Sequence, residues 1–106
     1  MTNAETLFDR IVEQFTGAVP GVTLGKMMSS PGLKYADKVF AFYHKETMGF
    51  RLGKQFDPEK FGLKTAHLLN PFKNKPPIQG WFIVEAAESE CWEPLAEMAL
   101  EFTRKL

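Results

Sequence analysis

The chain has 106 residues and a mass of 12.0 kDa, which is enough for one domain built around one hydrophobic core. Apolar residues make up 44% of it and 13 basic side chains balance 13 acidic ones, which argues against disorder and against a wholly basic nucleic-acid binder. No apolar run approaches the roughly 18 residues of a membrane-spanning helix, and the N-terminus lacks the basic start of a secretory signal, so we expect no contact with a membrane.

The N-terminal segment predicts an amphipathic helix over residues 3–16. Thr2 and Glu5 form a capping box, and the apolar positions that follow recur at helical spacing. Gly17 is a typical residue at which such a helix ends. After a proline–glycine turn, alternating apolar side chains predict a strand over residues 22–28.

Two strands in the middle of the chain are predicted to pair as a hairpin. The segment 29–32, which reads SSPG, has the composition of a loop. Residues 38–44 read KVFAFYH and are rich in aromatic and β-branched side chains, while residues 47–53 alternate apolar side chains with glycine or arginine. The connection at Lys45-Glu46 is short, but it contains neither Asn-Gly nor Asp-Gly, so the turn type stays open.

The next segment predicts a short helix and two more strands. An Asp-Pro pair supplies a cap and a first helical residue, so we expect one or two helical turns over residues 57–61. Strands are expected over residues 65–72 and 79–86, with a proline-rich loop over residues 74–77 between them.

The C-terminal segment predicts a second long helix. Ser89 can cap it, although Pro94 belongs in a first helical turn and therefore favours a start near residue 93. We expect one face of this helix, with Leu95 and Phe102, to pack on the sheet or on the N-terminal helix. That face carries Trp92, Leu95, Ala99, Phe102 and Leu106.

Taken in order, these elements predict an α+β fold of two layers. The expected architecture is an antiparallel five-stranded sheet with the helices on one face, in the order α-β(3)-α-β(2)-α. The chain shows no internal repeat, no low-complexity segment and no linker. One domain therefore spans residues 1–106.

The order of elements and several short motifs resemble the N-terminal domain of TfoX/Sxy-like proteins and, more loosely, the YjbR-like proteins. The resemblance extends over about residues 5–105, nearly the whole chain. The motifs that carry it are Lys26-Met27-Met28, Val39-Phe40-Ala41, Gly49-Phe50-Arg51-Leu52, Pro71-Phe72, Gly80-Trp81-Phe82-Ile83-Val84 and the segment from Trp92 to Leu100.

This resemblance implies the fold order given above and a bacterial, cytoplasmic protein. It implies no established reaction, because the best-known members of the family act as regulators. The chain departs from the family pattern at Ser29-Ser30, where a glycine-rich turn is expected, and it carries one domain where the competence regulators carry a second, helical one. A regulatory role for this single domain is therefore an analogy at the level of the fold.

The residue types that carry catalysis or bind metals are sparse and badly spaced. His44 and His67 are the only histidines, and neither belongs to a zinc-binding motif. The single cysteine, Cys91, excludes an internal disulfide and lies beside Glu90 and Glu93, which oppose a thiolate. Nucleophile-elbow, phosphate-loop and dinucleotide motifs are absent. We therefore predict no enzyme, no metal and no cofactor, with an unseen active site as the least favoured alternative.

Charge is sorted along the chain, with a basic middle between acidic ends. Residues 26–75 hold ten basic and four acidic side chains, while residues 1–25 and 76–106 are both net acidic. This pattern fits separate solvated surfaces, or a basic region that meets an acidic partner, an acidic helix of a second copy or a phosphate backbone. The candidate anion-binding residues are Lys34, Lys38, Lys54, Lys73 and Lys75.

Alternation along the strands predicts a mixed apolar and basic patch on the sheet face away from the helices. If Met48 and Phe50 face the helices, Arg51 faces away, and placing Glu85 in solvent puts Trp81 and Ile83 on that same outer face. Tyr43 would join them if Phe40 and Phe42 face inward. The candidate partner-binding residues are therefore Tyr43, Arg51, Trp81 and Ile83. The alternative is a flipped register that places Trp81 in the core.

These observations favour a small, non-enzymatic interaction module of TfoX N-terminal type, with a possible regulatory role. We expect its partner to be another protein or a second copy of the chain. The alternative is a nucleic-acid-associated transcription or competence regulator that uses the basic middle segment. Aromatic side chains in that segment could stack bases, but the RNA-recognition consensus is absent, so nucleic acid is the less favoured partner.

Overall fold

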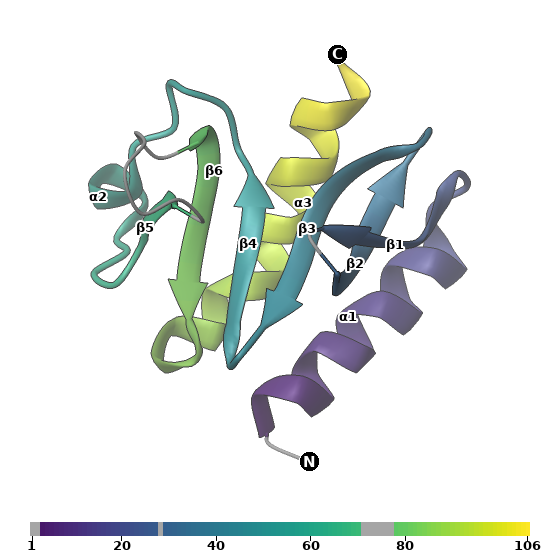
Figure 1. The fold of residues 1–106 in the computed structure, drawn as a ribbon, viewed down its shortest axis with the longest axis horizontal. Helices are drawn as coiled ribbons and strands as arrows, with labels where there is room; N and C mark the ends of the chain where they lie inside the picture. The colour runs from purple at the N-terminus through teal and green to yellow at the C-terminus, as the bar shows by residue number, and fades with distance from the viewer. Residues whose placement is uncertain (1–2, 28, 71–77) are drawn as a thin grey trace.

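The computed structural model describes residues 3–27, 29–70 and 78–106. Among these residues, six strands form one antiparallel sheet in the order β1-β2-β3-β4-β6-β5, and the two long helices cover one of its faces (Figure 1). The elements are α1 (Asn3–Ala18), β1 (Val22–Met27), β2 (Ser30–Tyr35), β3 (Lys38–His44), β4 (Thr47–Arg51), α2 (Pro58–Phe61), β5 (His67–Leu69), β6 (Ile78–Glu85), the 3₁₀ segment η1 (Ala86–Cys91) and α3 (Trp92–Arg104).

The predicted α+β fold is confirmed, and the sheet has one strand more than the five expected. The additional strand is β2, whose first residues were expected to form a loop because they read Ser-Pro-Gly. Pro31 pairs with Lys26 of β1, whereas pairing with β3 begins only at Gly32, so the missing amide hydrogen falls at the start of the strand. Gly32 lies so close to β3 that a Cβ there would meet the carbonyl oxygen of Ala41 at 2.3 Å.

The hairpins β2–β3 and β3–β4 are both closed by two-residue turns. The central residues have positive φ angles, 49° and 68° at Ala36 and Asp37 and 46° and 63° at Lys45 and Glu46. Two positive φ values define a type I′ turn, whose twist matches that of the flanking strands. These turns therefore form without the Asn-Gly or Asp-Gly pairs that normally mark them.

The main hydrophobic core lies between the sheet and the two long helices. Leu95 and Ala99 of α3 are fully buried there, together with Ile11 and Phe15 of α1, as their helical spacing predicted. Phe102 is only half-buried, so its predicted place in the core is wrong, and Leu106, expected on the same helical face, lies beyond the end of α3 with 55% of its surface exposed. The largest fully buried side chains are Trp92, Phe40, Phe50, Ile11, Leu33, Met48, Leu95 and Val84.

An irregularity in β3 reverses the side chains that follow it. Leu33 of β2 pairs with Ala41, but the next residue of β2 pairs with Val39, so Phe40 is an extra residue on β3. Phe40 and Ala41 therefore both belong to the core under the helices, and Phe42 lies on the opposite face. Strict alternation from Phe40, as assumed from the sequence, gives the wrong face for every residue after it in the strand.

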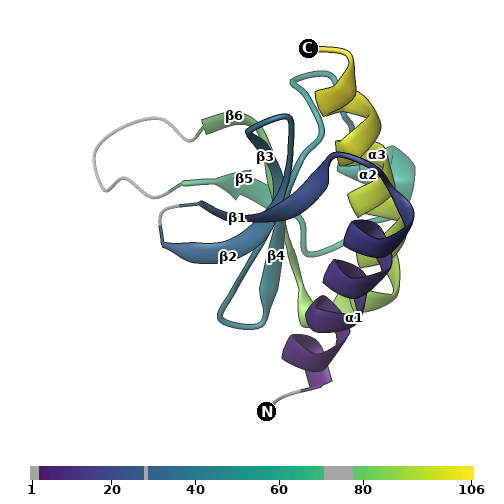
Figure 2. The same cartoon turned by 90° about the vertical axis from the view of Figure 1, so that its right-hand side faces the viewer.

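A second, smaller cluster of buried residues lies on the sheet face turned away from α1 and α3, which we call the strand face. The pairs β1–β2 and β5–β6 both project to this side (Figure 2). Phe42 occupies the space above Gly49, where a Cβ would lie 2.2 Å from the phenyl ring, and it contacts Trp81 at 5.6 Å between ring centroids. The buried members of the cluster are Phe42, Leu69, Trp81 and Ile83.

Glu88 of η1 holds the loop that leads into β5. Its carboxylate accepts hydrogen bonds from the backbone amides of Lys64, at 2.9 and 3.0 Å, and Thr65, at 2.7 Å. The Thr65 hydroxyl donates a further bond at 2.6 Å. This one side chain therefore connects two segments that are more than 20 residues apart in the sequence.

We expect Glu88→Gln to destabilise the fold at neutral pH and to lose that effect in acid. The bond from the Thr65 hydroxyl, followed by the amides of Lys64 and Thr65, lowers the pKa of Glu88. Because the folded-state pKa lies below the unfolded one, the carboxylate stabilises the fold above the unfolded value of about 4.3 and stops doing so as the pH falls through the folded value. Urea unfolding between pH 7 and pH 3 measures this, with Glu97→Gln as an exposed control. A difference from wild type that stays constant down to pH 3 contradicts the assignment.

Among the described residues, no helix is both long and apolar enough to cross a membrane.

Candidate binding face

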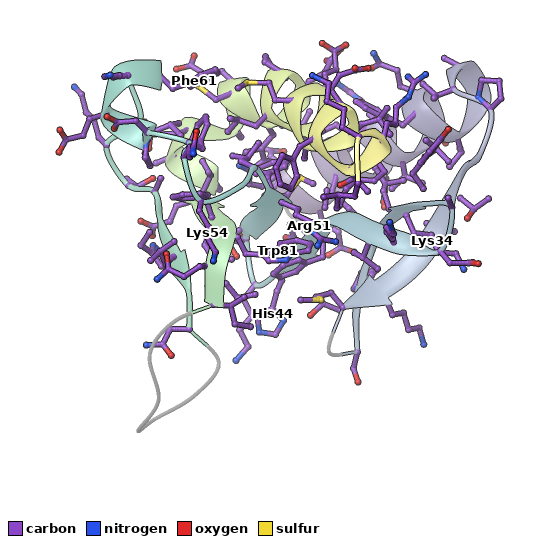
Figure 3. The ribbon with its side chains drawn as sticks, turned by 90° about the horizontal axis from the view of Figure 1, so that it is seen from above. Lys34, His44, Arg51, Lys54, Phe61 and Trp81 are labelled. Atoms are coloured by element: carbon purple, nitrogen blue, oxygen red, sulfur yellow. The ribbon has the colours of Figure 1, made fainter. Side chains whose placement is uncertain are left out.

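The strand face has an apolar floor with basic side chains around it. Arg51 lies directly opposite Trp81 in the β4–β6 ladder, and Gly49 lies opposite Ile83 in the same ladder. Arg51, Trp81 and His44 all lie on the side of the sheet away from the helices (Figure 3). The floor is packed, since Trp81 and Ile83 are each only 7% exposed.

Two hollows open at the border of this face, and Phe102 of α3 helps to line one of them. One, of about 260 Å³, is lined by Arg51 and Lys54 together with Trp81 and Gly80, and we call it the Arg51 hollow. The other, of about 250 Å³, is lined by His44, Lys45, His67 and the apolar Phe42 and Ile83. No carboxylate lines either hollow among the described residues.

The cations of the hollows are not neutralised within the part of the chain that the structure describes. Arg51, Lys54 and Lys45 have no carboxylate there within salt-bridge distance, whereas Lys34 lies 3.7 Å from Asp37. An unpaired guanidinium or ammonium at the edge of a packed floor keeps its full capacity for an external anion.

Acidic side chains gather on the opposite side of the molecule. Eight of the 13 carboxylate residues lie in the helices that cover the other sheet face or in the segment that leads into α3. They are Glu5, Asp9, Glu13, Glu88, Glu90, Glu93, Glu97 and Glu101. The neutral overall charge therefore divides into an acidic helical side and a strand face with a mainly basic border, on which Glu85 follows Trp81 and Ile83 in the alternation of β6.

The structure brings three of the four predicted partner-binding residues together. Arg51, Trp81 and Ile83 share the strand face, but Tyr43 does not. Tyr43 is buried under the helices, where its ring stacks on Phe8 at 5.2 Å, because the extra residue in β3 turns it inward. The apolar patch expected to be left in water is instead packed as a cluster, and only its basic border is accessible.

The predicted anion-binding lysines are divided between the two sides. Lys34 lies opposite Val39, a residue of the strand-face cluster, and Lys54 lines the Arg51 hollow. Lys38 lies opposite Tyr35, which packs against the core under the helices, so it is directed to the other side. Lys73 and Lys75 lie outside the described residues.

Sequence reasoning missed the residues that complete this face. Phe42 was assigned to the helix side, and His44, Lys45 and His67 were not expected to lie near one another. Their proximity depends on the order β4-β6-β5, which places β6 between two strands that precede it in the chain. The position of Phe42 does leave a signal in the sequence, which is the glycine between apolar residues in β4. Gly49 leaves the space on the strand face that Phe42 fills.

A groove of about 600 Å³ lies between α1 and the strands β1 to β3. Its polar residues have mixed charge, with Glu5 and Asp9 on α1 and Lys45 across from them. Ser30 Oγ and His44 Nδ1 are 3.1 Å apart at the edge of this groove. Among the described residues, no carboxylate forms a hydrogen bond with either side chain, so a Ser-His-carboxylate triad is not formed there. The described residues also contain no cluster of three or more metal-ligating side chains.

We expect Cys91 to be alkylated more slowly than a free cysteine at the same pH. Burial raises the pKa of its thiol, and the carboxylates of Glu90 and Glu88 raise it further, so less thiolate is present. The rate with iodoacetamide at pH 8, compared in the folded protein and in urea, measures this. Equal rates in the two states contradict the assignment.

The chain matches no family model, no curated protein and no solved structure. The resemblance to the TfoX/Sxy-like family stays a prediction from its short motifs.

Proposed function

We propose that the protein is a non-enzymatic interaction module that binds an acidic surface of a partner protein through its strand face. The observation that carries the proposal is the set of cations without a salt bridge, Arg51, Lys54 and Lys45, around two hollows at the border of the strand face, with Lys45 also lining the groove toward α1. With the acidic side chains on the helical side, the molecule presents a positive face with a defined orientation to an approaching partner.

The packed floor explains how such a face discriminates between partners. Phe42 and Trp81 pack together as a cluster, and the cations border it at defined points of the chain: Arg51 at the end of β4, Lys45 in the two-residue turn between β3 and β4, and Lys54 in the turn that follows Gly53. Charge complementarity then sets the orientation and the rate of association, and binding weakens as salt is added.

The same floor favours a protein partner over single-stranded nucleic acid. Base stacking needs exposed aromatic faces, and Phe42 and Trp81 are only 3% and 7% exposed. Phe40 and Tyr43, the other aromatic residues of β3, lie in the core under the helices. If the resemblance to TfoX-like domains holds, the module is a regulator in a bacterial cytoplasm.

A direct test compares three labelled probes by fluorescence anisotropy at low and high salt. The probes are a glutamate-rich peptide, a single-stranded DNA of the same charge and a neutral peptide of the same length. The variant Arg51→Glu/Lys54→Glu reverses two cations of the strand face. Lys38→Glu/Lys60→Glu makes the same change of charge at exposed positions away from it.

We expect the acidic peptide to bind the wild type more tightly than the other two probes do. Its affinity falls about tenfold for the Arg51→Glu/Lys54→Glu variant and stays nearly unchanged for the control variant. Tighter binding of the DNA than of the peptide overturns the proposal in favour of the nucleic-acid alternative. Equal losses in both variants, or no binding of any probe, also overturn it.

A further inference from the structure

The Arg51 hollow is walled by hydrogen-bond donors. Arg51 supplies a guanidinium fork and Lys54 an ammonium, and neither has a carboxylate partner among the described residues. Trp81 lines the same hollow, is more than nine-tenths buried, and has an indole N–H with no hydrogen bond to another described group. The amide of Gln79 adds a further donor to this wall.

The backbone around the hollow is shaped by two glycines with positive φ angles. Gly53, at 90°, directly precedes Lys54, and Gly80, at 87°, directly precedes Trp81. The carbonyl of Gly80 accepts hydrogen bonds from the amides of Leu52, at 2.9 Å, and Gly53, at 3.1 Å. These bonds bring the end of β4 against β6, so the segments that carry the two cations and the indole are held together.

The size of the hollow limits what it can hold. Its volume of about 260 Å³ is below the roughly 300–1,000 Å³ of pockets that enclose a whole small molecule. It therefore accommodates one end group of a larger molecule. Ile78 and Phe102 contribute an apolar part of the lining, which suits the carbon atoms next to a charged group.

We infer that the Arg51 hollow is a binding site for a phosphate monoester group. Two unpaired cations match the double charge of such a group, and the several N–H donors of the lining residues match its three terminal oxygens in number. A carboxylate, with one charge and two oxygens in a plane, uses fewer of these donors. The inference rests on the proposed function for the source of the group, which is a phosphorylated side chain on the partner protein.

The test uses the intact protein and follows binding by calorimetry and by tryptophan fluorescence. Trp81 lines the hollow, whereas Trp92 is fully buried elsewhere and supplies a constant background. The probes are one peptide in three forms, with phosphoserine, glutamate or serine at its centre, together with phenyl phosphate and inorganic phosphate. The variants are Arg51→Gln and Lys54→Gln, with Lys60→Gln on α2 as the matched control and Trp81→Phe to remove the indole donor.

We expect the phosphoserine peptide to bind at least about tenfold more tightly than the glutamate form, and Arg51→Gln and Lys54→Gln each to remove most of that preference. Lys60→Gln leaves the preference unchanged, and Trp81→Phe reduces it while the far-ultraviolet circular dichroism stays that of the wild type. Equal affinity for the phosphoserine and glutamate forms overturns the inference but leaves the proposed function standing.

Two other outcomes separate the possible sources of the group. Tight binding of phenyl phosphate and of the phosphoserine peptide alike supports the site itself. If phenyl phosphate binds while no acidic or phosphorylated peptide does, the site takes a small organic phosphate and the proposed protein partner is wrong. Binding of inorganic phosphate alone, unaffected by Arg51→Gln, overturns the site.

Discussion

Replacing Trp92 by alanine is expected to reduce the free energy of unfolding by about 3–5 kcal/mol. The indole is fully buried at the start of α3, its N–H donates to the carbonyl of Val84 at 3.2 Å, and its ring meets Tyr43 edge-on at 6.2 Å. One side chain therefore joins the end of β6, the middle of the sheet and the helical layer.

Trp92→Phe is the control for this substitution. It keeps most of the ring contacts and loses the hydrogen bond, so we expect a loss of about 1–3 kcal/mol. Urea unfolding followed by circular dichroism measures both variants without depending on tryptophan emission. A loss below about 1 kcal/mol for Trp92→Ala would show that α3 does not pack on β6 in this way.

The second large effect is expected for Trp81→Ala, and it concerns the strand face. Trp81 is 7% exposed and packs on Phe42, so truncation opens a cavity in the smaller cluster and costs about 3–5 kcal/mol. An exposed Trp81 would instead make this substitution weaken binding to a partner without changing stability. Its burial makes stability the first property to change.

Measuring unfolding and acidic-peptide binding on the same variants separates these two roles. Arg51→Gln is expected to have the opposite effect to Trp81→Ala. It leaves the unfolding midpoint nearly unchanged and weakens binding of the acidic peptide. If Trp81→Ala is as stable as the wild type, Trp81 is free to act as a partner anchor and the packed floor is wrongly assigned.

The long helices and most strands could be predicted because local patterns determine them. Helical spacing in α1 and α3 and alternation in β4 are visible within a few residues, and β3 was predicted with its observed bounds. β2 was missed because Ser-Pro-Gly indicates a loop by composition. Its strand conformation comes from pairing with β1 and β3 on both sides, which no local pattern records.

The candidate site was predictable only in part, for a related reason. Arg51, Trp81 and Ile83 were placed on one face because each strand, taken alone, has an unbroken alternation. Tyr43 was misplaced because the extra residue at Phe40 leaves no mark among consecutive aromatic side chains. The Arg51 hollow was not predictable, because Lys54 and Trp81 meet only through the β4–β6 pairing.

The paired strands of the two hairpins restrict where this chain can vary in length. Both Ala36-Asp37 and Lys45-Glu46 connect their strands with no spare residue, and side chains alternate between faces with a period of two. One residue added within the ladder β2–β3–β4 would exchange the side chains of the two faces, carrying Arg51 under the helices and Phe50 into solvent. A chain that preserves this basic face can therefore gain a residue only outside the ladder, as a longer hairpin turn, or within a strand as a further bulge like the one at Phe40.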